Sequence, residues 1–422
     1  MTDDAAAEDE VPGANRLPAC VTPLETVEDF LQEARARLPE AMWNQLCGDY
    51  GAEAWRTMSN NIDGFKALKL KPRVMVDVST RCLRTSVLGC EIALPVMIAP
   101  SGSHQRWHVD GELATAKAAA RAGTIMALSS ASTFSIEEVA ATSTGPRWFQ
   151  AYVFRDRRVT ARLIERAERA GYAAVVVTVD MPGTDSPERE VSFPRYNFGR
   201  EFDYVPTIDP SRLLRNLEGM EATGLELPTH RALNQYFDTR FTWSDLAWIR
   251  ELTSLPIVIK GIQTAEDARL CRECGVEGIV VSNHGGFALR NARATIDALP
   301  EVVAEAGSLE VYLDGGVRCG TDVLTALALG ATSVFIGRAH IWGLTVGGED
   351  GVVDVLELLR YELDQAMRYC GLTDVGDADE RLLVTGSSCA AKAGDDLLSR
   401  LSKAGILNGS QLQAARRVLA RP

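Results

Sequence analysis

No stretch of the sequence is apolar over the roughly 20 residues that a membrane-spanning helix requires. An excess of positive charge is also missing, because the formal net charge is −13 and the pI is about 5.0. Such an acidic chain is a poor partner for nucleic acid or an anionic membrane. The first ten residues, MTDDAAAEDE, are acidic and polar, whereas a signal peptide starts with a basic and then an apolar region. We therefore expect a soluble, cytoplasmic protein without nucleic-acid or membrane partners.

Regularly spaced cysteines and a cluster of metal ligands are also lacking. The nine cysteines are an odd number and most are scattered, which fits reduced thiols better than a disulfide framework. Cys271 and Cys274 form a CxxC pair in TAEDARLCRECG, a segment typical of an amphipathic helix ended by glycine. Since no second CxxC or histidine pair accompanies them, we interpret both thiols as helix-packing residues and expect no metal site.

The chain, which is 46% hydrophobic, does contain a regular alternation of short apolar segments and helical ones. Helical stretches such as RRVTARLIERAERAG separate most of the apolar segments, and several end in glycine, a signal of a helix C-terminus. Apolar strands that alternate with helices indicate a parallel sheet covered on both faces. Eight such strands predict an α/β fold, a (β/α)8 TIM barrel, with a doubly wound sheet as the less favoured alternative. The predicted strands are 94–100, 124–130, 147–153, 173–180, 255–261, 278–284, 309–316 and 333–339.

Polar residues gather at the carboxyl ends of these strands. In a barrel the strand ends converge on one face, where the following loops build the active site. Stability alone does not explain polar groups at equivalent positions in so many separate segments, so this face is the predicted active site. The residues concerned are Ser129, Ser130, Gln150, Tyr152, Thr178, Asp180, Lys260, Ser282, Asn283, His284, Asp314 and Arg338.

The chain divides into three predicted regions. Residues 1–22 are polar, with proline and glycine, and are expected to be a disordered arm. Residues 23–375 are assigned to the barrel, with one long connection, 181–243, between its fourth and fifth strands. Loops of this length are usually lids or disordered segments, so we expect a mobile lid that is partly helical near SRLLRNLEG. Residues 376–422 are expected to form a tail with one amphipathic helix, packed on the barrel or on a neighbouring subunit.

The loops after the seventh and eighth strands suit a phosphate group. LDGGVRCGTDV and FIGR bring glycines and arginines to the usual phosphate site of a TIM barrel, where backbone N–H groups and a helix N-terminus meet an anion. Arg318 and Arg338 would add charge-assisted hydrogen bonds. The glycines alone could serve only tight turns, but the two arginines favour a phosphorylated ligand.

Taken in order along the chain, these motifs carry a resemblance to a known family. VSNHGG, VIKG, LDGGVRCGTDVLTA and VFIGRA, with LPVMIAPSG, GTIMALSS, WFQAYVFRDR and VVVTVDMP, resemble the FMN-dependent 2-hydroxy-acid oxidases and dehydrogenases. That family includes glycolate oxidase, lactate oxidase and mandelate dehydrogenase, and the match runs over roughly residues 25–370. The resemblance implies an FMN-dependent enzyme that acts on CH–OH donors, passes electrons to O2 or to an electron carrier, and assembles as a homotetramer.

The resemblance also implies roles for individual residues. Lys260 would lie near the N1–C2=O edge of the flavin, where a fixed positive charge stabilises the anionic reduced form. His284 matches the catalytic base, Asp180 the carboxylate paired with it, and Tyr152 the tyrosine that contacts the substrate oxygen. The other residues predicted to hold the cofactor are Pro100, Ser101, Gly102, Ser130, Gln150, Thr178, Ser282, Asp314, Gly315, Gly316, Arg318, Gly337 and Arg338.

The chemistry agrees with a histidine base. Oxidation at an sp³ carbon needs a base whose pKa is near neutral, and histidine supplies one. The reaction leaves that histidine protonated, so a neighbouring carboxylate such as Asp180 would stabilise the imidazolium. A lone histidine is usually structural, but the position of His284 at a strand end, between SN and GG, favours catalysis.

The residues expected to bind the substrate carboxylate depart from the family's pattern. Arg189, in EREVS, is available for one of two clamping arginines, although two extra residues precede it, and Phe287 occupies the position of the other, directly after HGG. Cys47 stands where the family has a tyrosine, for which Tyr50 could substitute only if the backbone shifts. Ala131 replaces a bulky aromatic residue after the second strand.

These departures set the hypotheses for the substrate. A buried carboxylate without a bidentate arginine is costly, so the leading hypothesis is oxidation of a bulky or carboxylate-masked α-hydroxy or α-amino compound. An amide, an ester or a peptide-linked or carrier-bound substrate in a tailoring pathway would fit. The alternative is an ordinary 2-hydroxy acid, held by Arg189 with Arg290 or Arg293. A flavin-dependent isomerase without net oxidation and an FMN-binding protein without catalysis are further alternatives, and the intact catalytic residues argue against the last.

Overall fold

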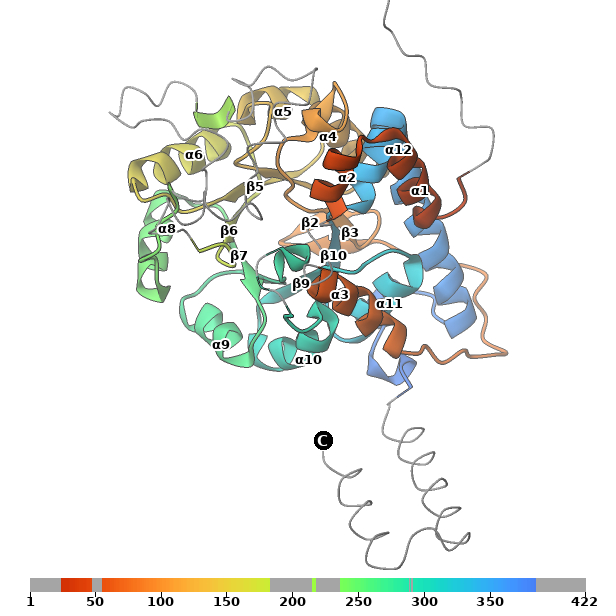
Figure 1. Ribbon diagram of the computed structural model, residues 1–422. Helices are drawn as coiled ribbons and strands as arrows, with labels where there is room; N and C mark the ends of the chain where they lie inside the picture. The colour runs from red at the N-terminus through yellow and green to blue at the C-terminus, as the bar shows by residue number, and fades with distance from the viewer. Residues whose placement is uncertain are drawn as a thin grey trace, which may run out of the picture.

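The computed structural model describes residues 24–47, 55–182, 215–217, 236–287, 289 and 291–384. Eight parallel strands close into a barrel in the order β10-β3-β4-β5-β6-β7-β8-β9, with helices around it (Figure 1). This confirms the (β/α)8 prediction and excludes the doubly wound sheet. The strands are β3 (Val96–Ile98), β4 (Met126–Ser129), β5 (Arg147–Ala151), β6 (Ala174–Thr178), β7 (Ile257–Ile262), β8 (Gly278–Val281), β9 (Glu310–Asp314) and β10 (Ser333–Ile336).

Three of the described α-helices precede the first strand, and the others follow strands of the barrel. Several begin at the residues that the sequence pattern indicates, as in α5, where Ser135 and Glu138 form a capping box. The α-helices are α1 (Val27–Arg37), α2 (Glu40–Cys47), α3 (Trp55–Ala67), α4 (Gly111–Ala122), α5 (Ile136–Thr142), α6 (Arg157–Arg169), α8 (Leu246–Leu252), α9 (Ala265–Glu273), α10 (Thr295–Ala306), α11 (Gly320–Ala328) and α12 (Ala339–Cys370). The 3-10 turns are η1 (His104–Arg106), η7 (Trp243–Asp245), η8 (His284–Gly286), η9 (Val375–Asp377) and η10 (Glu380–Leu382).

Large aromatic side chains and a hairpin fill the amino-terminal end of the barrel. Trp148, Tyr312 and Phe335 are fully buried and pack edge to face, with ring centroids 5.4–6.0 Å apart. They belong to one apolar cluster with the antiparallel hairpin of β1 (Thr85–Val87) and β2 (Cys90–Ile92). The alternate residues of the strands belong to the larger cluster that includes the helices. The amino-terminal part of the barrel is therefore a packed core, which leaves the carboxyl end for a binding site.

The regions predicted outside the barrel are described only in part. Residues 1–22 and the predicted tail helix lie outside the described residues, and so does most of the connection 181–243. Helix α12 ends at Cys370, with Gly371 in the left-handed conformation typical of a helix end. The first residues of the predicted tail pack on the barrel, because Leu383 pairs with Leu70 and Lys71 N–H donates to the Leu382 carbonyl at 2.7 Å.

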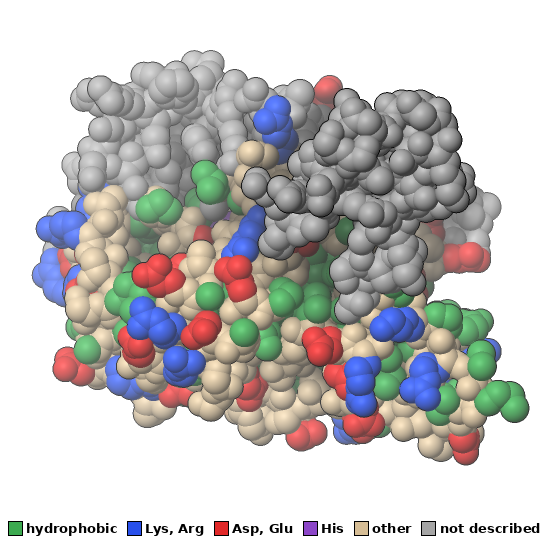
Figure 2. Space-filling view, turned by 90° about the horizontal axis from the view of Figure 1, so that it is seen from below, with side chains coloured by type: hydrophobic (Ala, Val, Ile, Leu, Met, Phe, Trp, Pro, Cys, Tyr) green, Lys and Arg blue, Asp and Glu red, His purple; other side chains and the backbone are tan. Residues whose placement is uncertain are grey.

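The surface carries charges of both signs. On the face drawn in Figure 2, basic and acidic side chains of the described residues are interspersed. Cys271 is buried in α9, which confirms it as a helix-packing residue, whereas Cys274 is exposed just beyond the helix end, so the same prediction was wrong for Cys274; both are free thiols. Among the helices described, none is long and apolar enough to cross a membrane.

Helix α12 folds back on itself at two glycines. Gly347 and Gly348 leave helical geometry, and the chain on either side comes together so closely that a Cβ on Gly343 would overlap the carbonyl of Gly351. The approach requires glycine at this contact because backbone lies against backbone, and neither side can move as a flexible side chain would.

Replacing Gly343 by alanine is therefore expected to lower the free energy of unfolding by about 1–3 kcal/mol, the usual cost of overpacking. Urea unfolding followed by circular dichroism measures it. Gly347→Ala is the matched control, because a Cβ there meets no atom within 4 Å. Equal losses in both variants would show that the Gly343–Gly351 contact does not limit packing.

Candidate active site

Adjacent strands present a continuous line of polar side chains at the carboxyl end of the barrel. The Ser129 hydroxyl donates to Gln150 Oε1 at 3.2 Å, and Gln150 Nε2 donates to Thr178 Oγ1 at 2.9 Å. Ser130 continues the line, because its backbone N–H donates to the Gln150 carbonyl at 3.0 Å. Its hydroxyl is buried without a hydrogen-bond partner among the described residues, so a ligand can bond to it.

Lys260 is the centre of the next group. Its side chain is buried, and Nζ lies 2.8 Å from Ser282 Oγ and 3.0 Å from Asp314 Oδ2. Burial by itself lowers the pKa of Lys260, but Asp314 and Asp180 outweigh it, so that the pKa lies above its usual value. Asp314 Oδ1 is also buried and has no partner among the described residues. A fixed positive charge and a free acceptor therefore stand side by side.

His284 and Asp180 form a pair at the rim. His284 Nδ1 lies 2.9 Å from Asp180 Oδ1. Burial by itself raises the pKa of Asp180, but the charges of His284 and Lys260 outweigh it and the pKa falls below its usual value. The carboxylate is thus held ionised beside the imidazole.

The backbone fixes this pair. His284 has a positive φ of 56° and its N–H donates to Ser282 Oγ at 3.1 Å, a conformation that is uncommon for a residue with a side chain and that often marks a functional site. Gly261 has a φ of 121°, and a Cβ there would lie 2.6 Å from the Asp180 Cβ. Glycine is therefore required where β7 passes the carboxylate.

Tyr152 stands next to the pair. Its ring stacks on Phe237, with centroids 4.3 Å apart, and burial together with Asp180 raises the pKa of the phenol well above its usual value. The phenol is thus neutral and can donate a hydrogen bond to a substrate oxygen.

Two arginines occupy the predicted phosphate site. Arg338 donates to the Leu46 and Gly285 carbonyls at 3.0 and 2.9 Å, and its guanidinium lies 4.8 Å from the centroid of the Phe287 ring. Burial, together with the charge of Arg318, lowers the pKa of Arg338 to about 10. Neither arginine forms an ion pair with a carboxylate of the described residues. Two neighbouring guanidinium groups that form no direct ion pair within the described part of the chain fit an anionic ligand.

The glycines of this site are also required by packing. Gly315 and Gly316 have φ values of 91° and 92°, and a Cβ on either would meet Asn61 of α3. The close approach to α3 therefore explains both glycines even without a phosphate.

Helix α3 contributes residues that the sequence pattern did not identify. Asn61 and Asn283 are buried and exchange two side-chain hydrogen bonds, of 2.9 and 2.7 Å, and Thr295 N–H donates to Asn61 Oδ1 at 3.1 Å. Asn61 thereby fixes the segments after β8 and before α10. The available signal was an asparagine at helical spacing between the buried Met58 and Phe65.

Of the residues predicted to bind the substrate, some lie among the described residues and others do not. Cys47 is buried at the end of α2, next to the Leu46 carbonyl that binds Arg338. Ala131 lies against the loop after β3, which carries Pro100 and Ser101, and its carbonyl accepts from Ser103 N–H at 3.1 Å. A Cβ on Gly102 would lie 3.3 Å from the Ala131 Cβ. Arg189, Tyr50 and Arg290 lie outside the described residues, and Arg293 is paired with Glu301 at 2.6 Å.

A family model for FMN-dependent dehydrogenases matches residues 34–385. The chain belongs to this family. It shares 43% identity over 364 residues with glycolate oxidase 5 of Oryza sativa subsp. japonica, covering 85% of this chain and 95% of the relative. A peroxisomal (S)-2-hydroxyacid oxidase of Arabidopsis thaliana is 41% identical over 356 residues, 83% of this chain and 94% of the relative. FMN is therefore the cofactor, and the protein is an FMN-dependent oxidoreductase that acts on CH–OH donors.

Solved structures agree with this family. A variant of a chimera of (S)-mandelate dehydrogenase has a TM-score of 0.75 and 34% identity, covering 86% of this chain and 99% of that chain. A mandelate oxidase in which an arginine is replaced by leucine, solved with 2-hydroxy-phenylacetamide, has a TM-score of 0.70 and 36% identity over 86% of this chain and 98% of that chain.

The family corrects the predicted localisation. The expectation of a cytoplasmic protein was wrong, because a relative that matches over most of its length is a peroxisomal enzyme and one structural neighbour is described as membrane-associated. Composition and charge describe solubility, whereas a compartment is set by short signals that receptors recognise.

The described residues fit FMN, since Arg318 and Arg338, which no described carboxylate pairs directly, suit its phosphate, and the unpartnered Ser130 and Asp314 oxygens suit its polar edges. Arg338→Ala is expected to weaken FMN retention by about 1.5–3 kcal/mol, the value of hydrogen bonds to charged groups. Titration of the apoprotein with FMN measures it. Arg121→Ala, which removes a surface arginine paired with Glu349 and Asp350, should leave FMN affinity unchanged, and a loss of similar size there would contradict the assignment.

Proposed function

We propose that this protein oxidises the hydroxyl-bearing carbon of a 2-hydroxy acid or a close derivative, with His284 as the base and FMN as the immediate electron acceptor. The observation that carries the proposal is the His284–Asp180 pair, 2.9 Å apart at the carboxyl end of the barrel and next to the buried Lys260. Family membership favours this oxidation over an isomerisation without net electron transfer. Oxidation of an α-amino compound, a homotetrameric assembly and the final acceptor, O2 or an electron carrier, stay predictions from the sequence.

His284 and Asp180 divide the proton chemistry between them. With Nδ1 bonded to Asp180, the other ring nitrogen, Nε2, is left to accept a proton from the substrate. Asp180, which stays ionised, then stabilises the imidazolium. Tyr152 is a neutral phenol because burial and the negative charge of Asp180 raise its pKa, and it orients the substrate oxygen. FMN, when bound, accepts the two electrons that leave the substrate carbon.

Residues around the barrel rim would hold the cofactor. Lys260 provides the fixed positive charge that the reduced flavin requires, and its two carboxylate neighbours keep it protonated. Arg318 and Arg338 would bind the phosphate, with backbone N–H groups near Gly315, Gly316 and Gly337. The polar edge of the flavin would meet the line of hydroxyl and amide groups formed by Ser130, Gln150 and Thr178, with Pro100, Ser101, Gly102, Ser282 and Asp314 on the neighbouring strand ends.

Two substrate classes fit this chemistry. A free 2-hydroxy acid is what the relatives are named for, and their similarity extends over most of this chain. A masked acid, such as an amide, is favoured by Phe287, whose half-buried ring lies on the Arg338 guanidinium and leaves an apolar wall after His284. A neighbouring mandelate oxidase with one arginine replaced by leucine was solved with an α-hydroxy amide. The small side chains of Cys47 and Ala131 add room for such a substrate.

His284→Ala is expected to retain FMN but to slow flavin reduction by a factor of about 10²–10⁴, the usual contribution of a positioned base. Asp180→Asn is also expected to be slow, because the imidazolium that forms on His284 loses its counter-charge. Stopped-flow absorbance of the flavin measures both. His108→Ala, at a partly exposed histidine beside Asp110, is the control. Unchanged reduction in His284→Ala would remove this residue from the mechanism.

Phe287→Arg is expected to raise the rate of flavin reduction by mandelate relative to mandelamide by about tenfold or more, since charge-assisted hydrogen bonds to a carboxylate contribute about 1.5–3 kcal/mol. Phe287→Leu keeps the apolar wall without the ring and should leave the ratio unchanged. Stopped-flow measurements with lactate, mandelate and mandelamide on the wild type decide between the two substrate classes. Fast reduction by mandelate with mandelamide inert would establish the free acid and reject the masked one.

A further inference from the structure

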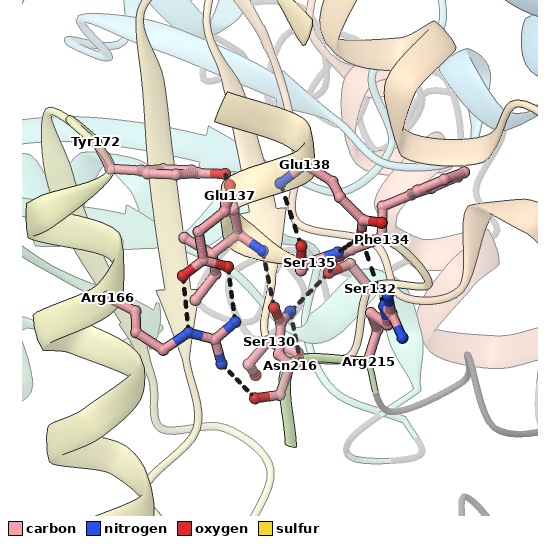
Figure 3. A network of polar contacts seen from close by, with 11 residues as sticks. Ser130, Ser132, Phe134, Ser135, Glu137, Glu138, Arg166, Tyr172, Arg215 and Asn216 are labelled. Carbon is pink, nitrogen blue, oxygen red and sulfur yellow. Dashed lines mark hydrogen bonds and ion pairs between the residues drawn. The ribbon is translucent and has the colours of Figure 1, made fainter. Parts of the chain in front are cut away.

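Asn216 lies in the β6–β7 insertion (residues 181–243), in a stretch of three described residues, 215–217, that packs against the loop between β4 and α5 (Figure 3). Its side chain is fully buried, and so is that of Leu217. A buried asparagine needs partners for both ends of its amide, since unpaired polar groups are costly in the interior.

The Asn216 amide uses both ends on the β4–α5 loop. Oδ1 accepts from the Ile136 N–H at 2.9 Å, at the start of α5. Nδ2 donates to Ser132 Oγ at 2.8 Å and to the Ser130 carbonyl at 3.4 Å. Three hydrogen bonds from one side chain thus fix both ends of the loop from Ser130 to Ile136.

The backbone of Asn216 is also held by a hydrogen bond. Its carbonyl accepts from Arg166 Nη1 at 2.7 Å, and Arg166 is held in a two-point pair with Glu137, with contacts of 2.8 and 2.7 Å. Arg215 lies 3.6 Å from Glu138. Helices α5 and α6 therefore hold this point of the insertion in place, and the amide points from it towards Ser130 (Figure 3).

Ser130 connects this contact to the cofactor site. Its N–H is held by the Gln150 carbonyl on β5, and its carbonyl by Asn216, while its own hydroxyl is buried and has no partner among the described residues. The two backbone bonds leave the residue little freedom to turn. The unused hydroxyl thus belongs to a residue held directly after β4, at the end of the barrel where the flavin is expected to bind.

We propose that Asn216 is a positioning residue for FMN: its amide sets the orientation of Ser130 and so makes cofactor affinity depend on how the β6–β7 insertion is attached. The proposal rests on the flavin contact assigned to Ser130 under the proposed function. A purely structural role for Asn216 would stabilise the fold without acting through the Ser130 hydroxyl.

A double-mutant cycle on the holoenzyme separates the two roles, because residues that act through one another are not additive. The rate of FMN release is followed by the rise in flavin fluorescence on dilution for the wild type, Ser130→Ala, Asn216→Ala and the double variant. Ser130→Ala and Asn216→Ala are each expected to raise the rate about tenfold, which corresponds to about 1.4 kcal/mol, the value of one hydrogen bond. The double variant is expected to stay near tenfold.

Two further variants keep the test decisive. Asn216→Asp retains the acceptor for Ile136 N–H but loses both donors, so it should release FMN as fast as Asn216→Ala, and it replaces that variant should the alanine protein not fold. Tyr172→Phe is the matched control: it removes a 3.0 Å hydrogen bond to the Ile136 carbonyl, at the same end of α5, without touching Ser130. It should lower the unfolding temperature but leave FMN release unchanged.

A release rate near a hundredfold in the double variant would overturn the proposal, because Asn216 and Ser130 would then act independently. Faster release in Tyr172→Phe would overturn it as well, since general loosening of α5 would explain the effect. No change in Ser130→Ala would instead reject the flavin contact of Ser130, and with it the basis of the proposal.

Discussion

The buried ammonium group of Lys260 is the interaction on which the rest of this site depends. A cation removed from water needs compensation, and here it comes from Asp314 at 3.0 Å and from the field of Asp180. Lys260 lies on β7, Asp314 on β9 and Asp180 just after β6. Their charges therefore balance only when the barrel closes with these strands in register. Asp180 also bonds His284, whose Nδ1 lies 2.9 Å from Asp180 Oδ1. The carboxylate of Asp180 thus helps to stabilise the buried Lys260 and also pairs with the catalytic His284.

Much of this arrangement could be predicted from the sequence, for a physical reason. Parallel strands buried on both faces appear as short apolar runs, and closure brings their carboxyl ends together, so polar residues at those ends meet whatever the details of the loops. The pairing of His284 with Asp180 and the place of Lys260 followed from that rule and from the resemblance. The correct number and order of the strands followed as well.

What could not be predicted depends on contacts between distant segments that leave no local pattern. Asn61 and Asn283, which are hydrogen-bonded, are 222 residues apart in the sequence, and Asn216 and Ser132 are 84 residues apart. Nothing in the local sequence around any of them indicates these contacts. The β1–β2 hairpin consists of two strands of three residues, too short to show an alternation. The sequence places Phe287 where the family has a clamping arginine, but it does not indicate that the Phe287 ring lies against Arg338 of the phosphate site.

The position of α3 has a consequence for how the enzyme is made. This helix leaves the ribosome before any barrel strand, yet its partners Asn283 and Thr295 follow only after 222 and 234 further residues. Until β8 and β9 have been synthesised, the face that carries Met58, Asn61 and Phe65 lacks its contacts with the segments around Gly286, Gly315 and Gly316. Contacts of such long sequence separation form late and expose apolar surface meanwhile. Completion of the catalytic face is therefore expected to be a late event in the folding of this chain.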